Sequence, residues 1–120
     1  MDLHALQDAV LAFDRERGWE QFHDPKNLCM ALASEVGELN AVLRWVRNED
    51  IDSALADRSN RDAIRQEIAD VGILLLLLCA RTGVRIDQAV LEKLEQNALK
   101  YPIHESRGVA EPPARILSPG

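Results

Sequence analysis

The sequence has few aromatic residues and, before its last twenty residues, few of the residues that interrupt helices. Aromatic side chains make up 4% of its 120 residues and hydrophobic residues make up 47%, so any core is built from aliphatic side chains. Pro25 is the only proline before residue 101, and leucine and alanine are abundant. This composition favours helices over sheets, and the length is that of one domain.

Basic residues are outnumbered by acidic ones, 14 to 20, and no long apolar segment is present. The formal net charge is -6 and no basic stripe runs along the chain, which argues against binding to nucleic acid or to an anionic membrane. The longest apolar run, Val71 to Ala80, is too short to span a bilayer. The first residues do not show a basic segment followed by an apolar one, so no signal peptide is expected.

Cysteine occurs only twice, as Cys29 and Cys79, and each lies within an apolar run. Two buried free thiols are expected rather than a disulfide, which indicates a reducing compartment. Together with the expected lack of a leader and of a membrane span, this predicts a soluble cytoplasmic protein.

Apolar residues recur at helical spacing in four segments, so the sequence predicts an all-α fold with a subunit of the four-helix-bundle type. The expected helices run from about residue 3 to 17, 25 to 46, 60 to 82 and 87 to 101. Gly18 and Gly83 are expected stops. The expected N-caps are Asp24, Ser59 or Asn60, and Asp87.

The regions outside these four helices are polar. Residues 47–60 are expected to form a loop or a short helix. Residues 1–104 are predicted to form one domain. Residues 105–120 are rich in proline, glycine and charge. We expect them to be a poorly ordered C-terminal tail or to pack against a neighbouring subunit.

The third predicted helix has no polar face between Val71 and Ala80. A helix on the surface of a protein keeps one polar side. We therefore expect this stretch both at the centre of the domain and in an interface between subunits.

Four acidic residues lie within or beside the apolar faces of the second and third helices. Glu35 and Glu38 are three residues apart on one helix, and Glu67 and Asp70 are three apart on the other, so each pair points to one side of its helix. Pairs with this spacing are common on solvated helix faces. Both pairs are here embedded in apolar sequence, where burying unpaired like charges costs several kcal/mol.

Three arrangements would relieve this cost: protonation of the acids, pairing with Arg44, Arg65 or Lys93, or binding of a cation. Cation binding fits best, because four carboxylates offer only hard oxygen ligands, which suit Mg²⁺ or Mn²⁺ and not zinc. A di-iron site is a weaker alternative, because it needs two Glu-x-x-His motifs and the chain has one, Glu20 to His23. Mg²⁺ shares its ligand shell with substrate phosphates, so the acids indicate phosphate chemistry.

Three segments of the sequence resemble the MazG-like all-α nucleoside triphosphate pyrophosphohydrolases, and within them the dCTP pyrophosphatase branch. The segments are WEQFHDPKNLCMALASEVGELNAVLRWV, EIADVGILLLLLCARTGVRID and AVLEKLEQNALKYP. The resemblance covers roughly residues 10 to 104, and the acid motifs of the family match at Glu35, Glu38, Glu67 and Asp70. It implies a homotetramer, built as a dimer of dimers, that hydrolyses a (deoxy)nucleoside triphosphate to the monophosphate and pyrophosphate with Mg²⁺ held by these acids.

The resemblance also implies substrate-binding residues. Trp19 and Trp45 match tryptophans that line the base pocket, and His23 matches a histidine in the segment between the first two helices. On the last helix, Lys93 matches a lysine directed to the phosphates and Asn97 matches an asparagine near the sugar or base. The set is completed by Tyr101 in the KYP ending. Each residue type also serves purely structural roles, tryptophan in cores and interfaces above all.

The chain departs from the family pattern at four positions. Asp24 and Lys26 stand where the pattern has glutamine and arginine, Val10 stands for a histidine, and Leu74 stands for a tyrosine. These departures alter contacts expected with the sugar and base, and they leave the acid motifs intact.

The sequence therefore predicts hydrolysis of dCTP or a modified dCTP, with Glu35 or Glu38 activating the attacking water. Two alternatives stay open: the same chemistry on another nucleotide such as dATP or dUTP, and a non-catalytic helical scaffold that binds a nucleotide or a partner. Gly37, between the first two acids, is expected to let a neighbouring helix or the substrate come close.

Overall fold

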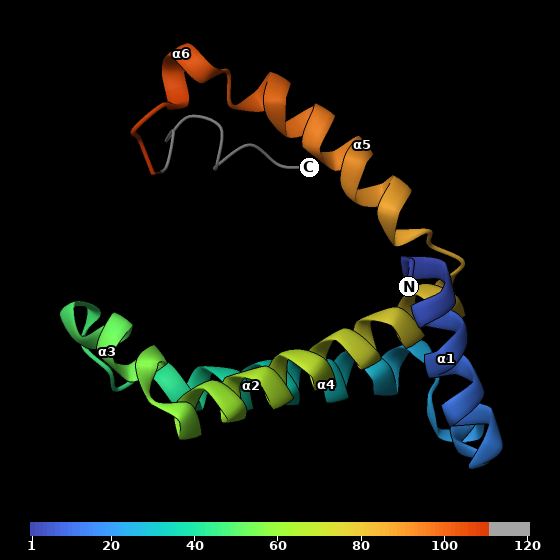
Figure 1. Ribbon diagram of the computed structural model, residues 1–120. Coiled ribbons are helices and arrows are strands. Elements are labelled where there is room, and N and C mark those ends of the chain that lie inside the picture. The colour runs from blue at the N-terminus through green and yellow to red at the C-terminus, as the bar shows by residue number, and fades with distance from the viewer. Residues whose placement is uncertain (111–120) are drawn as a thin grey trace. The chain divides into compact units, whose positions relative to one another are not determined.

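The structure is a computed structural model that describes residues 1–110. Over these residues the chain is helical and contains no strand, as predicted (Figure 1). It divides into two compact units, the first over Met1–Val84 and the second from Arg85 onward. A helix with the length and apolarity needed to cross a membrane does not occur among residues 1–110.

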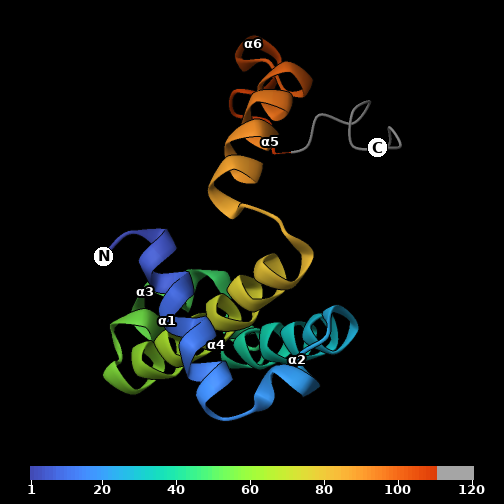
Figure 2. The same ribbon diagram turned by 90° about the vertical axis from the view of Figure 1, so that its right-hand side faces the viewer.

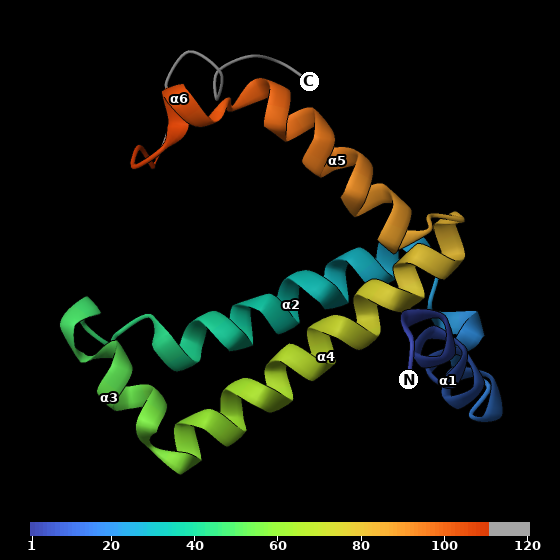
Figure 3. The same cartoon turned by 45° about the horizontal axis from the view of Figure 1, so that its top comes forward.

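The first unit is built on two antiparallel helices that lie side by side, α2 (Pro25–Leu43) and α4 (Arg58–Thr82) (Figure 3). α1 (Leu3–Glu16) packs against α4 (Figure 2). The side-chain amide of Gln7 on α1 donates a hydrogen bond of 3.1 Å to the backbone carbonyl of Leu76, which ties α1 to the C-terminal half of α4.

Short helices make the connections in this unit. The 3₁₀ helix η1 (Trp19–Phe22) joins α1 to α2. A second 3₁₀ helix, η2 (Asn48–Asp50), and α3 (Ile51–Ala56) join α2 to α4, which confirms the short helix that the sequence allowed there.

Two helix starts differ from the prediction. Asp57, rather than Ser59 or Asn60, caps α4, because its extended backbone lets its carboxylate accept the N–H of Asn60 at 3.1 Å. Asp87 lies inside α5, which begins one residue earlier, at Ile86. The end of α2 is also three residues earlier than predicted. Asp24 does cap α2, as expected, accepting the N–H of Asn27 at 2.8 Å.

The core lies along α4. Its buried hydrophobic residues are Leu28 of α2, which is fully buried, and, on α4, Leu76, Leu77 and Cys79. The apolar stretch of α4 therefore contributes most of the buried residues, although Ile73 within it is 41% exposed, and its predicted place in a subunit interface stays a prediction. Both cysteines are free, but the prediction that both are buried is wrong for Cys29, which is exposed. Burial raises the pKa of the Cys79 thiol, which keeps it protonated and unreactive.

The second unit consists of α5 (Ile86–Lys100) and the short α6 (Ile103–Ser106). α5 is apolar along one side, and in this unit Leu91 and Leu99 are 63% and 85% exposed. The division into a domain over 1–104 and a tail over 105–120 stays a prediction, and residues 111–120 of that tail lie outside the described residues.

Candidate metal and nucleotide site

Three of the four predicted acids come together between α2 and α4. One carboxylate oxygen from each of Glu35, Glu67 and Asp70 lies within 4.8 Å of the other two. Glu35 and Glu67 are partly buried, and Asp70 is exposed. Glu38 is exposed and does not belong to this close group, although its charge still acts on Glu67.

The acid cluster, formed by Glu35, Glu67 and Asp70, has no basic partner within the first unit. None of the ion pairs among residues 1–84 involves these acids or Glu38. Of the two arginines proposed as partners, Arg44 instead places its guanidinium 5.6 Å from the ring of Trp45, and Arg65 is exposed. Pairing with arginine therefore does not relieve the charge of the cluster in this unit.

Glu67 experiences the crowding of charge most strongly. Its Oε2 atom is buried and has no hydrogen-bond partner. The neighbouring Glu35 side chain is the main cause that raises the pKa of Glu67 above its ordinary value of 4.5, and burial and the charges of Glu35, Asp70 and Glu38 add to the rise. An orphaned oxygen among like charges is an arrangement that a hard cation would stabilise.

A cavity of about 360 Å³ opens beside the acid cluster, between α1, η1, α2 and α4. Its polar lining contains Glu35 and Asp70 of the cluster, His23 of the predicted substrate-binding set, and Asp14. The rest of the lining is apolar or aromatic: Val10, Phe13, Trp19, Ile73, Leu74 and Leu77. Two of the departures from the family pattern, Val10 and Leu74, therefore belong to the wall of this cavity.

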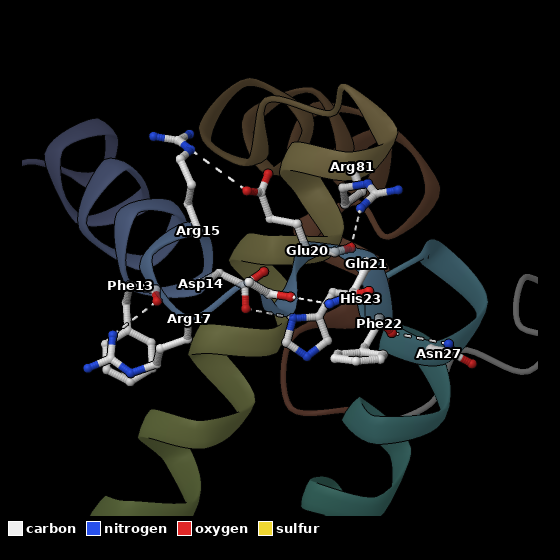
Figure 4. A network of polar contacts seen from close by, with 11 residues as sticks. Phe13, Asp14, Arg15, Arg17, Glu20, Gln21, Phe22, His23, Asn27 and Arg81 are labelled. Atoms are coloured by element: carbon white, nitrogen blue, oxygen red, sulfur yellow. Dashed lines mark hydrogen bonds and ion pairs between the residues drawn. The ribbon is translucent and has the colours of Figure 1, made fainter.

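η1 lies at the end of the cavity away from the acid cluster. The Nη1 atom of Arg81 donates a hydrogen bond of 3.1 Å to the backbone carbonyl of Glu20, which holds η1 beside the C-terminal end of α4 (Figure 4). Arg81 is about three helical turns, roughly 16 Å, along α4 from Asp70. The cavity thus has an acidic end and a second end lined by Trp19 and His23.

At this second end, a carboxylate faces an imidazole (Figure 4). Asp14 is only 4% exposed, and its Oδ1 lies 2.7 Å from Nδ1 of His23. The ring of Trp19 meets the rings of His23 and Phe13 edge-on, with centroids 6.4 and 5.8 Å apart. Sequence reasoning did not select Asp14. The available signal was its place one turn after Val10, on the otherwise apolar stripe of α1.

The remaining predicted residues lie outside this cavity lining. Trp45 follows α2 and is 84% exposed. Lys93 and Asn97 share one side of α5, and Tyr101 ends that helix with a 2.7 Å hydrogen bond from its N–H to the Asn97 carbonyl. A Cβ atom placed on Gly37 would meet no atom within 4 Å, so no neighbouring helix of the first unit, residues 1–84, approaches it.

These features define an all-helical protein with an acidic cluster at one end of a partly aromatic cavity. A model of the MazG-like family matches residues 29–112, and the chain belongs to that family. This confirms the family that the sequence motifs indicated.

Curated relatives include two mammalian proteins. The chain is 44% identical to dCTP pyrophosphatase 1 of Bos taurus over 98 residues and 41% identical to dCTP pyrophosphatase 1 of Homo sapiens over 95 residues. The alignments cover 82% and 79% of this chain, but only 58% and 56% of the two relatives. The chain thus spans less than three fifths of their length.

A solved structure has a similar fold. The crystal structure of a pyrophosphatase from Archaeoglobus fulgidus matches with a TM-score of 0.78 and 37% sequence identity. The match covers 83% of this chain and 92% of the archaeal one. The similarity in both structure and sequence supports the helical fold of this chain.

Proposed function

We propose that the chain hydrolyses a (deoxy)nucleoside triphosphate to the monophosphate and pyrophosphate, with Mg²⁺ or Mn²⁺ as its cofactor. The preferred substrate is dCTP or a modified dCTP. The observation that carries the proposal is the unpaired acid cluster at one end of a cavity whose other end holds Trp19 and His23. The pyrophosphatase activity in the names of the relatives supports the reaction, and dCTP in the mammalian names supports the base.

The acid cluster fits a divalent cation. Glu35, Glu67 and Asp70 would hold it, with Glu38 as the fourth ligand, and the orphaned Oε2 of Glu67 is one donor atom without a partner. All of these donors are hard oxygens. When bound, the ion supplies positive charge that neutralises the phosphates and polarises their oxygens.

Glu35 and Glu38 are the candidates for activating water. Glu35 lines the cavity, so its carboxylate faces the space where a phosphate would lie. Glu38 is one turn away and outside the close group, so an oxygen of Glu38 that does not bind the ion can accept a proton. A carboxylate that accepts a proton from water in the transition state accelerates such reactions typically by 10²–10⁴-fold.

The other predicted residues bind the substrate in this proposal. Trp19 and Trp45 stack on the base, which is worth about 1–3 kcal/mol for each base–aromatic contact. His23 and Asn97 contact the edge of the base or the sugar, Lys93 contacts the phosphates, and Tyr101 completes the set.

The active form in this proposal is a homotetramer assembled as a dimer of dimers. Exposed apolar side chains on α5 support association, since Val90, Leu91 and Leu94 are 50%, 63% and 57% exposed. Contiguous exposed apolar surface marks interaction sites in soluble proteins. Analytical ultracentrifugation of the full chain measures the assembly, and a monomer at micromolar concentration would contradict it.

The reaction is tested by a panel of nucleotides with Mg²⁺, with Mn²⁺ and with EDTA. We expect pyrophosphate release to be fastest with dCTP, slower with dATP and dUTP, and absent with EDTA. Release of orthophosphate would refute the proposed reaction. Nucleotide binding without turnover would instead assign the chain to the non-catalytic scaffolds.

A further inference from the structure

We infer that Asp14 is a positioning residue that fixes the tautomer of His23, and that the pair thereby selects nucleotides whose base presents an amino group to the cavity. The inference rests on the proposed function, because it takes the base to lie at the end lined by Trp19 and His23. Neither the acid motifs nor the substrate-binding residues implied by the family resemblance include Asp14.

The burial of Asp14 requires a partner. Its side chain is 6% exposed, and an ionised carboxylate without a partner is strongly unfavourable at such a position. Among residues 1–110, the only ion pair that it makes is with Nδ1 of His23, at 2.7 Å. A carboxylate can only accept, so a stable contact at this distance needs a proton on Nδ1. A lone pair on Nδ1 would instead face the negative charge.

The contact is short without being a linear hydrogen bond. The Nδ1 atom is buried, and no acceptor lies along the direction of its N–H. Hydrogen bonds at catalytic sites are often poorly aligned before the substrate binds and tighten in the complex. A rotation of the His23 ring toward Asp14 would align this one, and the tautomer that it requires is the same before and after rotation.

The tautomer decides what His23 offers to the cavity. Its side chain is 24% exposed while Nδ1 is buried, so the opposite side of the ring, which carries Nε2, is the exposed part. With the proton on Nδ1, Nε2 of the neutral ring carries a lone pair and is a hydrogen-bond acceptor. The cavity that His23 lines is largely apolar or aromatic, with Val10, Phe13 and Leu77 in its wall.

An acceptor in an apolar wall discriminates between base edges. The amino group of cytosine or adenine donates a hydrogen bond to Nε2. The carbonyl that uracil carries in place of the cytosine amino group would face the lone pair without a donor between them. A substrate that leaves a buried polar group of the site unpaired is rejected more strongly than a substrate that only lacks an apolar contact.

The tautomer can be measured without any enzymatic activity. His4 and His104 are exposed, so replacing both by glutamine leaves His23 as the single imidazole of the full chain. The ¹⁵N shifts of its ring are then recorded at a pH where the ring is neutral. We expect the proton on Nδ1 in this background and its loss from Nδ1 in Asp14→Ala and Asp14→Asn. Asp8→Asn, an exposed position on the same helix, is the matched control.

The selection is measured by the ratio of kcat/KM for dCTP to that for dUTP. We expect Asp14→Asn and Asp14→Ala to lower this ratio by about tenfold, the value of one hydrogen bond, and Asp8→Asn to leave it unchanged. Thermal unfolding of each variant verifies that it folds. The tautomer and the ratio are expected to change together.

Several results would overturn the inference. They are a proton on Nε2 instead of Nδ1 in the chain that keeps Asp14, an unchanged tautomer in both Asp14 variants, and an equal loss of kcat/KM for both nucleotides. The last result would make Asp14 a residue that only supports the fold. If the unsubstituted chain hydrolyses neither nucleotide, the proposed function fails, and the tautomer measurement alone decides whether Asp14 positions His23.

Discussion

The two ends of the cavity hold charge in opposite ways. At the acidic end, Glu35, Glu67 and Asp70 place like charges within 4.8 Å of one another, without a basic partner in the first unit. At the other end, the buried carboxylate of Asp14 lies 2.7 Å from Nδ1 of His23. The histidine end thus has an ion-pair partner within the chain, whereas in the proposed function the acidic end takes a cation from outside. The acidic end should therefore respond to metal, and the histidine end should not.

The largest effect is expected from Asp70→Asn, which keeps the shape of a ligand and removes its charge. We expect kcat/KM to fall on the order of a thousandfold, because the charge stabilisation that a metal ligand supports is worth several kcal/mol. Asp62→Asn, an exposed position on the same helix, should leave kcat/KM unchanged. Activity near the normal value in Asp70→Asn would remove the acid cluster from the reaction, and with it the contrast between the two ends.

A smaller effect is expected on stability, and it tests whether the acidic end is incomplete without metal. Mg²⁺ at a hundredfold excess over its Kd should stabilise the unsubstituted chain by about 2.7 kcal/mol. Glu67→Gln should largely abolish this gain, and Asp14→Asn should not. The measurement is thermal unfolding with Mg²⁺ and with EDTA. Equal stabilisation of Glu67→Gln would place the metal elsewhere.

The pH dependence of the metal-free chain follows from the raised pKa of Glu67. The folded state holds its proton more tightly than the unfolded state, so stability falls as the pH rises from 4.5 through the raised pKa. Above that window the loss stays constant. Glu67→Gln should therefore be more stable than the unsubstituted chain at neutral pH in EDTA, and equal to it well below pH 4.5.

The smallest effect is expected from Gly37→Ala, between Glu35 and Glu38. A Cβ atom there meets nothing within 4 Å, so alanine should raise the free energy of unfolding by about 0.5–1 kcal/mol through its higher helix propensity. Chemical denaturation measures this change. If stability rises while kcat/KM falls, the substrate or another subunit approaches the helix at this position.

Much of the acidic end could be predicted from the sequence, because each pair of acids lies within one turn of a single helix. Glu35 and Glu38 show their shared direction by a spacing of three, and Glu67 and Asp70 do the same. The order of the residues alone places these acids within apolar helices, where burial of their charge is unfavourable. That Glu35, Glu67 and Asp70 form the close group while Glu38 stays outside it depends on how α2 packs on α4, which spacing along one helix does not determine.

The other end could not be predicted in the same way, because its partners meet across a turn. Asp14 ends the apolar stripe of α1, and His23 follows η1, nine residues later. Their contact depends on Gly18, whose positive φ of 65° turns the chain, and on Arg81, which fixes η1 against α4. Neither spacing nor composition encodes that approach.

The helical class, the family and the four acids follow from the sequence, because helix periodicity and motif spacing are properties of short segments. The burial of one acid of α1 against a histidine, and the cavity that joins this pair to Glu35 and Asp70, follow only from the tertiary packing. The physical reason is that burial and pairing of charge depend on which helices pack together, and a residue's neighbours in space are set by the whole fold.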